Sequence, residues 1–437
     1  MTFRDRVCTT VIALVALTAT AFAPLSSSAQ QTDAAGNGAA LLLERLRENR
    51  LTLALEDGRL SGGGAELLLS EGRNAQFFLL GEEHGVAEIP ALTSAIFRAL
   101  TADGYRHLAI ETGDGLAAAL DSLARQPDPL EALTSWYEMH WPGAPFFTLR
   151  EEAALLVDAV DASPASRVLW GLDYDILADR HALPRLRALA TTPAQREAAD
   201  DAIAVADSLL RRAMDEGNPT HVMMFGGPEL VIEELRRAYA PEENTEADDI
   251  ISLLEQTRRI NGLWLSREAL RSNEERARWN KRQFAKYWHE ASERGADPPR
   301  VMMKFGANHM MRGLTPTNVY DLGSMASELA DGLGSRSFHV MVVAGEGAHH
   351  AVLNPAVMEY MPVPAGFQGN DWARPFFAAA DSLAWTVYDL RPLRPLAAQD
   401  QLGVLPEQIE KLIWAVDAFV VLTGSTPGTM LPVERSW

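Results

Sequence analysis

The sequence predicts an α/β fold with a mainly parallel sheet, helices on both faces and a helical insertion. Four short apolar runs end abruptly in polar residues, as buried strands do, at 77–80, 107–110, 168–170 and 301–303. Between the first two runs, Ile89 to Ala102 is apolar at helical spacing, which predicts a strand–helix–strand unit with a right-handed parallel crossover. Repetition of such units favours a parallel sheet between two layers of helices.

The remaining elements follow in chain order. Leu41 to Leu53 has amphipathic spacing and opens the folded part as a helix. The long, charged segment from Pro193 to Ala296 has helical periodicity, and His221 to Phe225 is its one candidate strand. Ser337–Ala344, Trp385–Leu390 and Ala418–Leu422 are further strand candidates. We therefore expect a single domain over 41–437, with a helical insertion over about 193–296.

The N-terminal segment 1–29 is typical of a secretory signal peptide. Arg4 and Arg6 precede an apolar run from Val11 to Ala23, and Ser27-Ser28-Ala29 is a small-x-small cleavage signal. The run is shorter than the ~20 residues that a spanning helix needs, which disfavours an uncleaved anchor. We expect cleavage near Ala29, export to the periplasm or medium, a flexible tether over 30–40, and no membrane association after cleavage.

Composition restricts the partners. The 437 residues include 59 acidic and 39 basic side chains, so a net charge of −20 leaves no basic surface for nucleic acid. The single cysteine, Cys8, lies in the leader, so the mature chain can form neither a disulfide nor a thiolate metal site. A small molecule, partly apolar, is the expected partner, and the oligomeric state stays open.

Polar side chains follow the four predicted strands. In parallel sheets, ligands bind beyond the carboxyl ends of the strands. The residues placed there are Glu82, Glu83, His84, Glu111, Asp173, Asn308 and His309. If the strands that end at Leu80, Ile110 and Met303 are neighbours, residues just past their ends lie within about 10 Å of one another.

Two chemistries fit these residues. His84 with Glu82 or Glu111 can act as a general base that activates water. Two imidazoles and two carboxylates (His84, His309, Glu82 and Glu111) can equally bind a divalent metal, and spacing does not decide between them. A Ser or Cys nucleophile is not indicated, since the sequence lacks Gly-x-Ser-x-Gly and the mature chain lacks cysteine.

Three further features border the expected site. Lys304 lies inside an apolar strand and needs a carboxylate partner such as Glu111 or Asp173; it is also a candidate for stabilising an oxyanion. The aromatic stretch 136–147, which includes Trp141, either covers an apolar substrate or packs into the core. Arg276 and Asn280 share one helical face, which points either into the cleft or to solvent.

The motifs resemble the erythromycin esterase family in kind and order. They are Leu80-Gly81-Glu82-Glu83-His84, Gly104-Tyr105 leading to Ala109-Ile110-Glu111-Thr112-Gly113, Leu169-Trp170-Gly171-Leu172-Asp173, Gly306-Ala307-Asn308-His309 and Val416-Asp417-Ala418-Phe419-Val420. The resemblance spans most of the mature chain. It implies the wider superfamily that joins these esterases to haem-binding lipoproteins of the ChaN type and, more distantly, to TraB and Tiki proteins.

The resemblance implies an exported hydrolase of esters or lactones that uses a His-activated water and requires no metal. His84 matches the general base, Glu82 and Glu111 the acidic residues of the first two motifs, and His309 the histidine of the fourth. Glu83, Asp173, Lys304, Asn308, Arg276 and Trp141 are the expected substrate contacts. Only Glu83 separates Glu82 from His84, as in the haem-binding branch, so a haem or metal carrier (His84, Glu111, His309 as ligands) is the alternative.

Overall fold

The computed structural model describes residues 29–243, 245–295 and 297–433 and confirms the α/β fold. Nine strands form one sheet in the order β2-β1-β10-β11-β7-β3-β6-β4-β5, and the six from β11 to β5 are parallel. The strands are β1 (Arg50–Glu56), β2 (Arg59–Ser61), β3 (Phe77–Glu82), β4 (Tyr105–Ile110), β5 (Leu169–Gly171), β6 (Arg300–Gly306), β7 (Ser337–Ala344), β10 (Trp385–Asp389) and β11 (Ala418–Leu422). A separate antiparallel hairpin joins β8 (His349–Asn354) to β9 (Glu359–Pro364).

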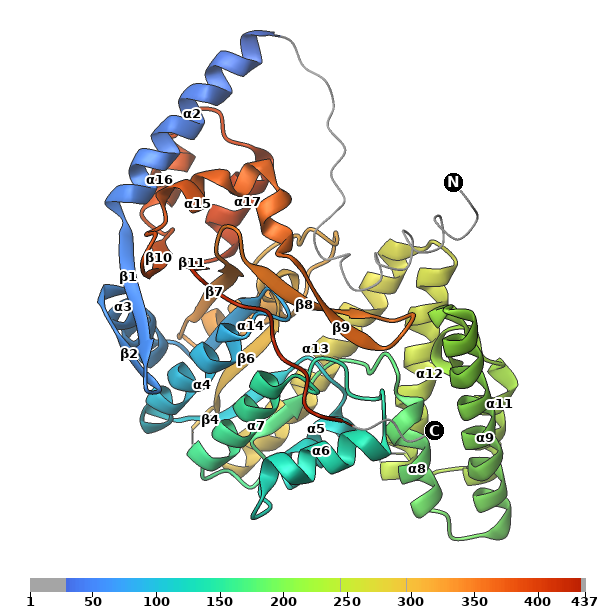
Figure 1. Ribbon diagram of the computed structural model, residues 1–437. Coiled ribbons are helices and arrows are strands. Elements are labelled where there is room, and N and C mark those ends of the chain that lie inside the picture. Colours follow the sequence, from blue (N-terminus) through green and yellow to red (C-terminus); the bar gives the residue numbers. More distant parts are fainter. Residues whose placement is uncertain (1–28, 244, 296, 434–437) are drawn as a thin grey trace.

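Helices cover both faces of the sheet, as predicted (Figure 1). One face packs Phe78, Leu80 and Met302 against α3 (Gly63–Asn74), α4 (Glu88–Leu100), α5 (Asp114–Leu123), α6 (Pro129–Met139) and α7 (Arg150–Ala162). Near β3 and β6, the opposite face is covered by α13 (Ala269–Arg294) and α14 (Leu322–Gly332). Near β10 and β11, α2 (Ala29–Glu48), α15 (Arg374–Ala379), α16 (Leu393–Ala398) and α17 (Glu407–Ala415) cover that same face.

The segment 193–296 is helical in its described residues. It contains α9 (Pro193–Glu216), α10 (Met223–Gly226), α11 (Glu229–Tyr239), α12 (Glu246–Leu265) and α13, and it packs with α8 (Asp179–Ala188) beside the sheet (Figure 1). The second half of α13 lies on the sheet itself, where Phe284 and Trp288 contact Phe77 edge to face. Helix α13 therefore connects the inserted helices rigidly to the strands that carry the candidate site.

Two sequence predictions of local structure are wrong. The expected helix Leu41–Leu53 ends with α2 at Glu48, and Arg50 starts β1, because Leu51, Leu53 and Leu55 alternate with the period of a strand. The candidate strand His221–Phe225 is instead a 3-10 turn (Pro219–His221) followed by α10. Its Met223 and Met224 pack among neighbouring helices.

Only part of the N-terminal segment belongs to the residues that the structure describes. Residues 1–28 of the predicted signal peptide (1–29) lie outside the described residues, and Ala29 is the first residue of α2. Residues 30–40, which the sequence predicts as a tether, lie within α2, consistent with the high helix propensity of their alanines. Gly38 packs closely against the backbone of Val404. Among the described residues, helices that combine the length and apolar character of a membrane span are absent.

Candidate functional site

The strand register brings the predicted site residues together. Strand β6 lies between β3 and β4, so the ends of these three strands are adjacent. The Nε2 atom of His84 lies 3.4 Å from Glu111 Oε2, and the Nε2 atom of His309 lies 3.6 Å from Glu111 Oε1. Residues 27 and 198 positions apart in sequence thus meet at one carboxylate.

Each histidine is held by a second carboxylate through its other nitrogen. His84 Nδ1 lies 2.9 Å from Glu82 Oε1, and His309 Nδ1 lies 2.7 Å from Asp321 Oδ2. A carboxylate accepts only, so each Nδ1 carries the proton and each Nε2 faces the Glu111 side. Sequence reasoning missed Asp321, whose only local signal is that of a helix cap, since it also accepts from the backbone N–H of Leu322.

Arg276 points into the site and not to solvent. Its guanidinium donates to Glu111 Oε1 at 2.6 Å and to Asp173 Oδ1 at 3.0 Å. Asn280, one turn further along α13, is fully buried, and its amide lies 2.9 Å from Asp173 Oδ1. Arg276 therefore links α13 to the ends of β4 and β5 and neutralises two buried carboxylates.

Glu111 is kept ionised by its neighbours. Burial alone would raise the pKa of Glu111, but the charges of His84, His309 and Arg276 and a hydrogen bond from the Gly306 backbone lower it to about 2. That backbone N–H lies 2.6 Å from Glu111 Oε2. A Cβ atom on residue 306 would lie 2.7 Å from His84 Nε2, so this close approach requires glycine.

Lys304 has a carboxylate partner, but the predicted partners Glu111 and Asp173 are wrong. Its Nζ donates to Glu82 Oε1 at 2.7 Å and to Glu152 Oε1 of α7 at 2.8 Å. Lys304 is in register with Leu80 and Ile110, so all three point to one face of the sheet. Glu82 lies two residues past Leu80 and keeps that face, whereas Glu111 lies one residue past Ile110 and points to the other.

Burial and neighbouring charges set the protonation of this cluster. Burial lowers the pKa of His84, but the carboxylates of Glu111 and Glu82 outweigh it and raise the pKa above its ordinary value. Burial would raise the pKa of Glu82, yet Lys304 and His84 lower it. Burial raises the pKa of Glu152 to about 7 against the opposing charge of Lys304.

The two histidines open on a cavity of about 210 Å³. Its wall includes Glu111, Asp173, Arg276 and Asn308 from the predicted set, and apolar side chains from Phe146, Ile176, Phe225, Ile260, Trp264 and Leu353. The Phe146 ring stacks on the His84 imidazole, with 4.4 Å between the ring centroids and 19° between the planes. Phe146 thus supplies the aromatic cover that the stretch 136–147 suggests.

Besides Lys304, two expected substrate contacts, Trp141 and Glu83, lie outside this cavity. Trp141 packs with Leu177, Leu210 and Phe225 in a neighbouring apolar cluster, so its ring is used for packing. Glu83 turns away from His84, as adjacent residues of an extended chain do, and is buried. Its carboxylate accepts from the backbone N–H groups of Ala344 at 2.9 Å and Gly366 at 2.6 Å, which joins β3 to the segment that follows β9.

The carboxylate between the two histidines is already engaged by other groups. Within the described ranges, clusters of three or more His, Cys, Asp or Glu side chains with a metal-binding arrangement are absent. Both oxygens of Glu111 already accept hydrogen bonds, from Arg276 and from Gly306. A divalent ion bound by His84, Glu111 and His309 would need a free oxygen of Glu111, and the Arg276 guanidinium already occupies one of them.

Comparison with known proteins shows the fold but not the family. No family model and no curated protein sequence matches this chain. Solved structures with this fold include a Bacillus cereus protein (TM-score 0.56, 15% identity, 90% of this chain and 99% of that one). A mutant of the erythromycin esterase EreC in its open conformation matches with TM-score 0.54 and 15% identity over 85% of this chain and 95% of its own. A succinoglycan biosynthesis protein matches with TM-score 0.56 and 14% identity over 93% of this chain and 100% of its own.

Because Lys304 is buried between two carboxylates, we predict that removing its ammonium group strongly destabilises the protein. In Lys304→Met, Glu82 and Glu152 lose their common cation, and we expect the free energy of unfolding to fall by ~3–5 kcal/mol in urea denaturation at pH 8. Without Lys304 the pKa of Glu152 rises further above about 7, so its buried carboxyl must stay charged or take up a proton at pH 8. Adding Glu152→Gln removes this cost and should restore part of the loss. Lys281→Met is the matched control, because its ammonium donates to the Tyr320 carbonyl at the surface. An equal loss in both lysine variants would contradict this account.

Proposed function

We propose that the protein is a hydrolase in which His84 activates water for attack on an ester or lactone carbonyl. One observation carries the proposal: two imidazoles that line the same cavity each have Nδ1 held by a separate carboxylate, and both place Nε2 beside Glu111. This is the arrangement in which one nitrogen is free to exchange a proton while the ring is fixed. The erythromycin esterase with this fold supports the reaction class.

The other ionisable groups of the site are poorer bases. Glu111, with a pKa of about 2, binds a proton too weakly, and Arg276 stays charged because the carboxylates of Asp173 and Glu111 outweigh its burial. Lys304 does not line the cavity, and its ammonium donates to Glu82, so it is not placed to stabilise an oxyanion there. We propose that His84 and His309 are the groups that transfer protons.

The reaction balances with these two histidines. The water oxygen bonds to the carbonyl carbon while its proton moves to His84 Nε2, and the carbonyl π electrons move to oxygen. Glu82 and Glu111 stabilise the imidazolium that forms. When the tetrahedral species collapses, the bond to the leaving alkoxide breaks, and the Nε2–H that His84 gained returns the proton to it. If an imidazolium of His309 donates the proton instead, His84 releases its own to solvent and His309 takes one up before the next turnover.

We propose an uncharged or weakly charged substrate with an apolar portion. Aromatic and aliphatic side chains form one side of the cavity, and the charged groups of the other side pair with one another. We propose that neither haem nor a divalent metal is required. A space of about 210 Å³ is below the ~300–1,000 Å³ typical of sites for drug-sized ligands, and the Glu111 oxygens are already engaged.

Loss of His84 tests the proposal directly. Against a panel of p-nitrophenyl esters and lactones, His84→Ala should reduce kcat by ~10² or more, the scale of a missing general base. Circular dichroism should show an unchanged fold. His349→Ala, at an exposed position of β8, is the control and should keep full turnover. Equal rates in the two variants would remove His84 from the mechanism.

The acid side of the pH profile tests the carboxylate partner. His84 must be neutral to accept a proton, so kcat/KM falls as the pH drops through the raised pKa of His84. Glu82→Gln removes one charge that raises this pKa and leaves the opposing charge of Lys304, so the fall should move to lower pH. The exposed Glu131→Gln should leave the profile in place. A shift to higher pH in Glu82→Gln would refute the assigned coupling.

We also propose that the chain is exported. The support is the order of Arg4, Arg6, the apolar run Val11–Ala23 and the Ser27-Ser28-Ala29 signal. In a Gram-negative host, N-terminal sequencing of the periplasmic protein should begin near Gln30. An intact Met1 on cytoplasmic protein would overturn the proposal.

A further inference from the structure

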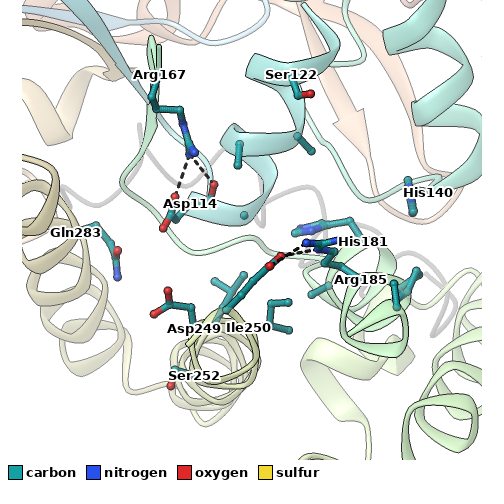
Figure 2. A pocket seen from close by; sticks show the side chains of 18 of the residues that line it. Asp114, Ser122, His140, Arg167, His181, Arg185, Asp249, Ile250, Ser252 and Gln283 are labelled. Carbon is teal, nitrogen blue, oxygen red and sulfur yellow. Dashed lines mark hydrogen bonds and ion pairs between the residues drawn. The ribbon is translucent and has the colours of Figure 1, made fainter. Parts of the chain in front are cut away.

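A second and larger cavity, of about 730 Å³, lies between helices of the sheet layer and helices of the 193–296 segment (Figure 2). Its walls come from α5 and α6 of the sheet layer, from α8 and α12 of the helical segment, and from α13 between them. The volume is within the ~300–1,000 Å³ typical of small-molecule sites. It exceeds the 210 Å³ cavity at His84 more than threefold.

The two cavities are neighbours, because residues of one lining contact residues of the other. Trp279 lines the larger cavity, and its indole N–H donates at 3.1 Å to the backbone carbonyl of Asp173, a residue of the His84 cavity. His181 Nε2 of the larger cavity lies 3.0 Å from Asp175 Oδ2, whose residue lines the smaller one. No residue is common to the two linings.

The charged side chains around the larger cavity neutralise one another. Arg167 pairs with Asp114 at 3.0 Å, and the Nη2 atom of Arg185 donates to Glu246 at 2.8 Å; Figure 2 shows these two pairs in different parts of the wall. Lys286 pairs with Asp249 at 3.2 Å. Three cations thus face three anions, which leaves no fixed net charge with which to recognise an ionic ligand.

The remaining wall offers rings and small side chains. Trp136 and Trp279 present indole surfaces, while Ala118, Ala119 and Ala182 leave the space open. The His140 ring lies 4.3 Å from that of Trp136. Burial lowers the pKa of His140 and outweighs the hydrogen bond to the Arg180 carbonyl, which raises it. The imidazole of His140 is therefore neutral at pH 7. Ser252 and Gln283 add uncharged hydrogen-bonding groups.

We propose that this cavity is a second binding site, which takes an uncharged, ring-bearing amphiphile that stacks on Trp136 and Trp279. The rings and aliphatic groups match an apolar ligand face, and the hydroxyl, amide and imidazole groups match a few polar substituents. An ionic ligand would have to break an existing ion pair or lie desolvated beside one. The site is independent of the reaction proposed at His84.

Two fluorescent probes with the same ring system test the proposal. N-phenyl-1-naphthylamine is uncharged, and 1-anilinonaphthalene-8-sulfonate differs by one anionic group. Titration of the full chain should show one site for the uncharged probe and at least tenfold weaker binding of the sulfonate. Ala119→Trp fills the cavity from α5, and Ser252→Trp fills it from α12. Each substitution should weaken binding of the uncharged probe at least tenfold.

Leu353→Trp is the matched control, because it fills the His84 cavity instead. It should change probe affinity less than twofold, and near-UV circular dichroism identifies any variant that fails to fold. Equal affinity for the two probes, unchanged binding in folded Ala119→Trp and Ser252→Trp, or lost binding in Leu353→Trp would each overturn the proposal. A probe-dependent change of mass in sedimentation velocity would also overturn it, because the cavity would then be an interface between two copies.

Discussion

The ammonium group of Lys304 must be neutralised where it lies, because an unpaired charge in the interior of a protein is strongly destabilising. Glu82 from the end of β3 and Glu152 from α7 supply the compensating charges. Glu82 is then fixed in place by Lys304 and, through the same oxygen, accepts from His84. The orientation of the candidate base thus depends on a cation that never reaches the cavity.

A second cation plays the equivalent part on the other face of the sheet. Arg276 joins the ends of β4 and β5 to α13 through Glu111 and Asp173. Glu111 in turn lies between the two histidine Nε2 atoms. Because Lys304 and Arg276 compensate different carboxylates, Glu82 and Glu111 stay ionised within the same small volume, and both act to raise the pKa of His84.

Much of this arrangement follows from sequence. Strands that end in polar residues predict a parallel sheet, and Ser337–Ala344 and Ala418–Leu422 coincide with β7 and β11. His84, Glu111, Asp173 and His309 were identifiable because each lies within three residues of the end of a buried strand. The strands β1 and β2 at the antiparallel end of the sheet were not, since β1 has one buried residue and is preceded by a helix whose apolar residues run into it, and β2 has only three residues.

The groups that sequence reasoning misplaces depend on long-range packing. Glu152 and Asp321 are acidic residues in or before helices, with no local sign that they face a buried lysine or a histidine. The partner of Lys304 follows only from strand register, which pairs Lys304 with Leu80 and so aligns it with Glu82. The sequence positions of Glu83 and Trp141 suggest a functional role. In the structure, Glu83 accepts hydrogen bonds from backbone N–H groups, and Trp141 packs in an apolar cluster.

The central claim is that Glu82, held by Lys304, fixes the proton of neutral His84 on Nδ1 and raises the pKa of the ring. Nitrogen-15 NMR of histidine-labelled protein, titrated across neutral pH, measures both quantities for this one side chain. The account predicts that neutral His84 carries its proton on Nδ1, with Nε2 free, and titrates above the ~6.5 of an unperturbed histidine. Protonation of Nε2 in the neutral form, or titration at or below that value, would contradict it.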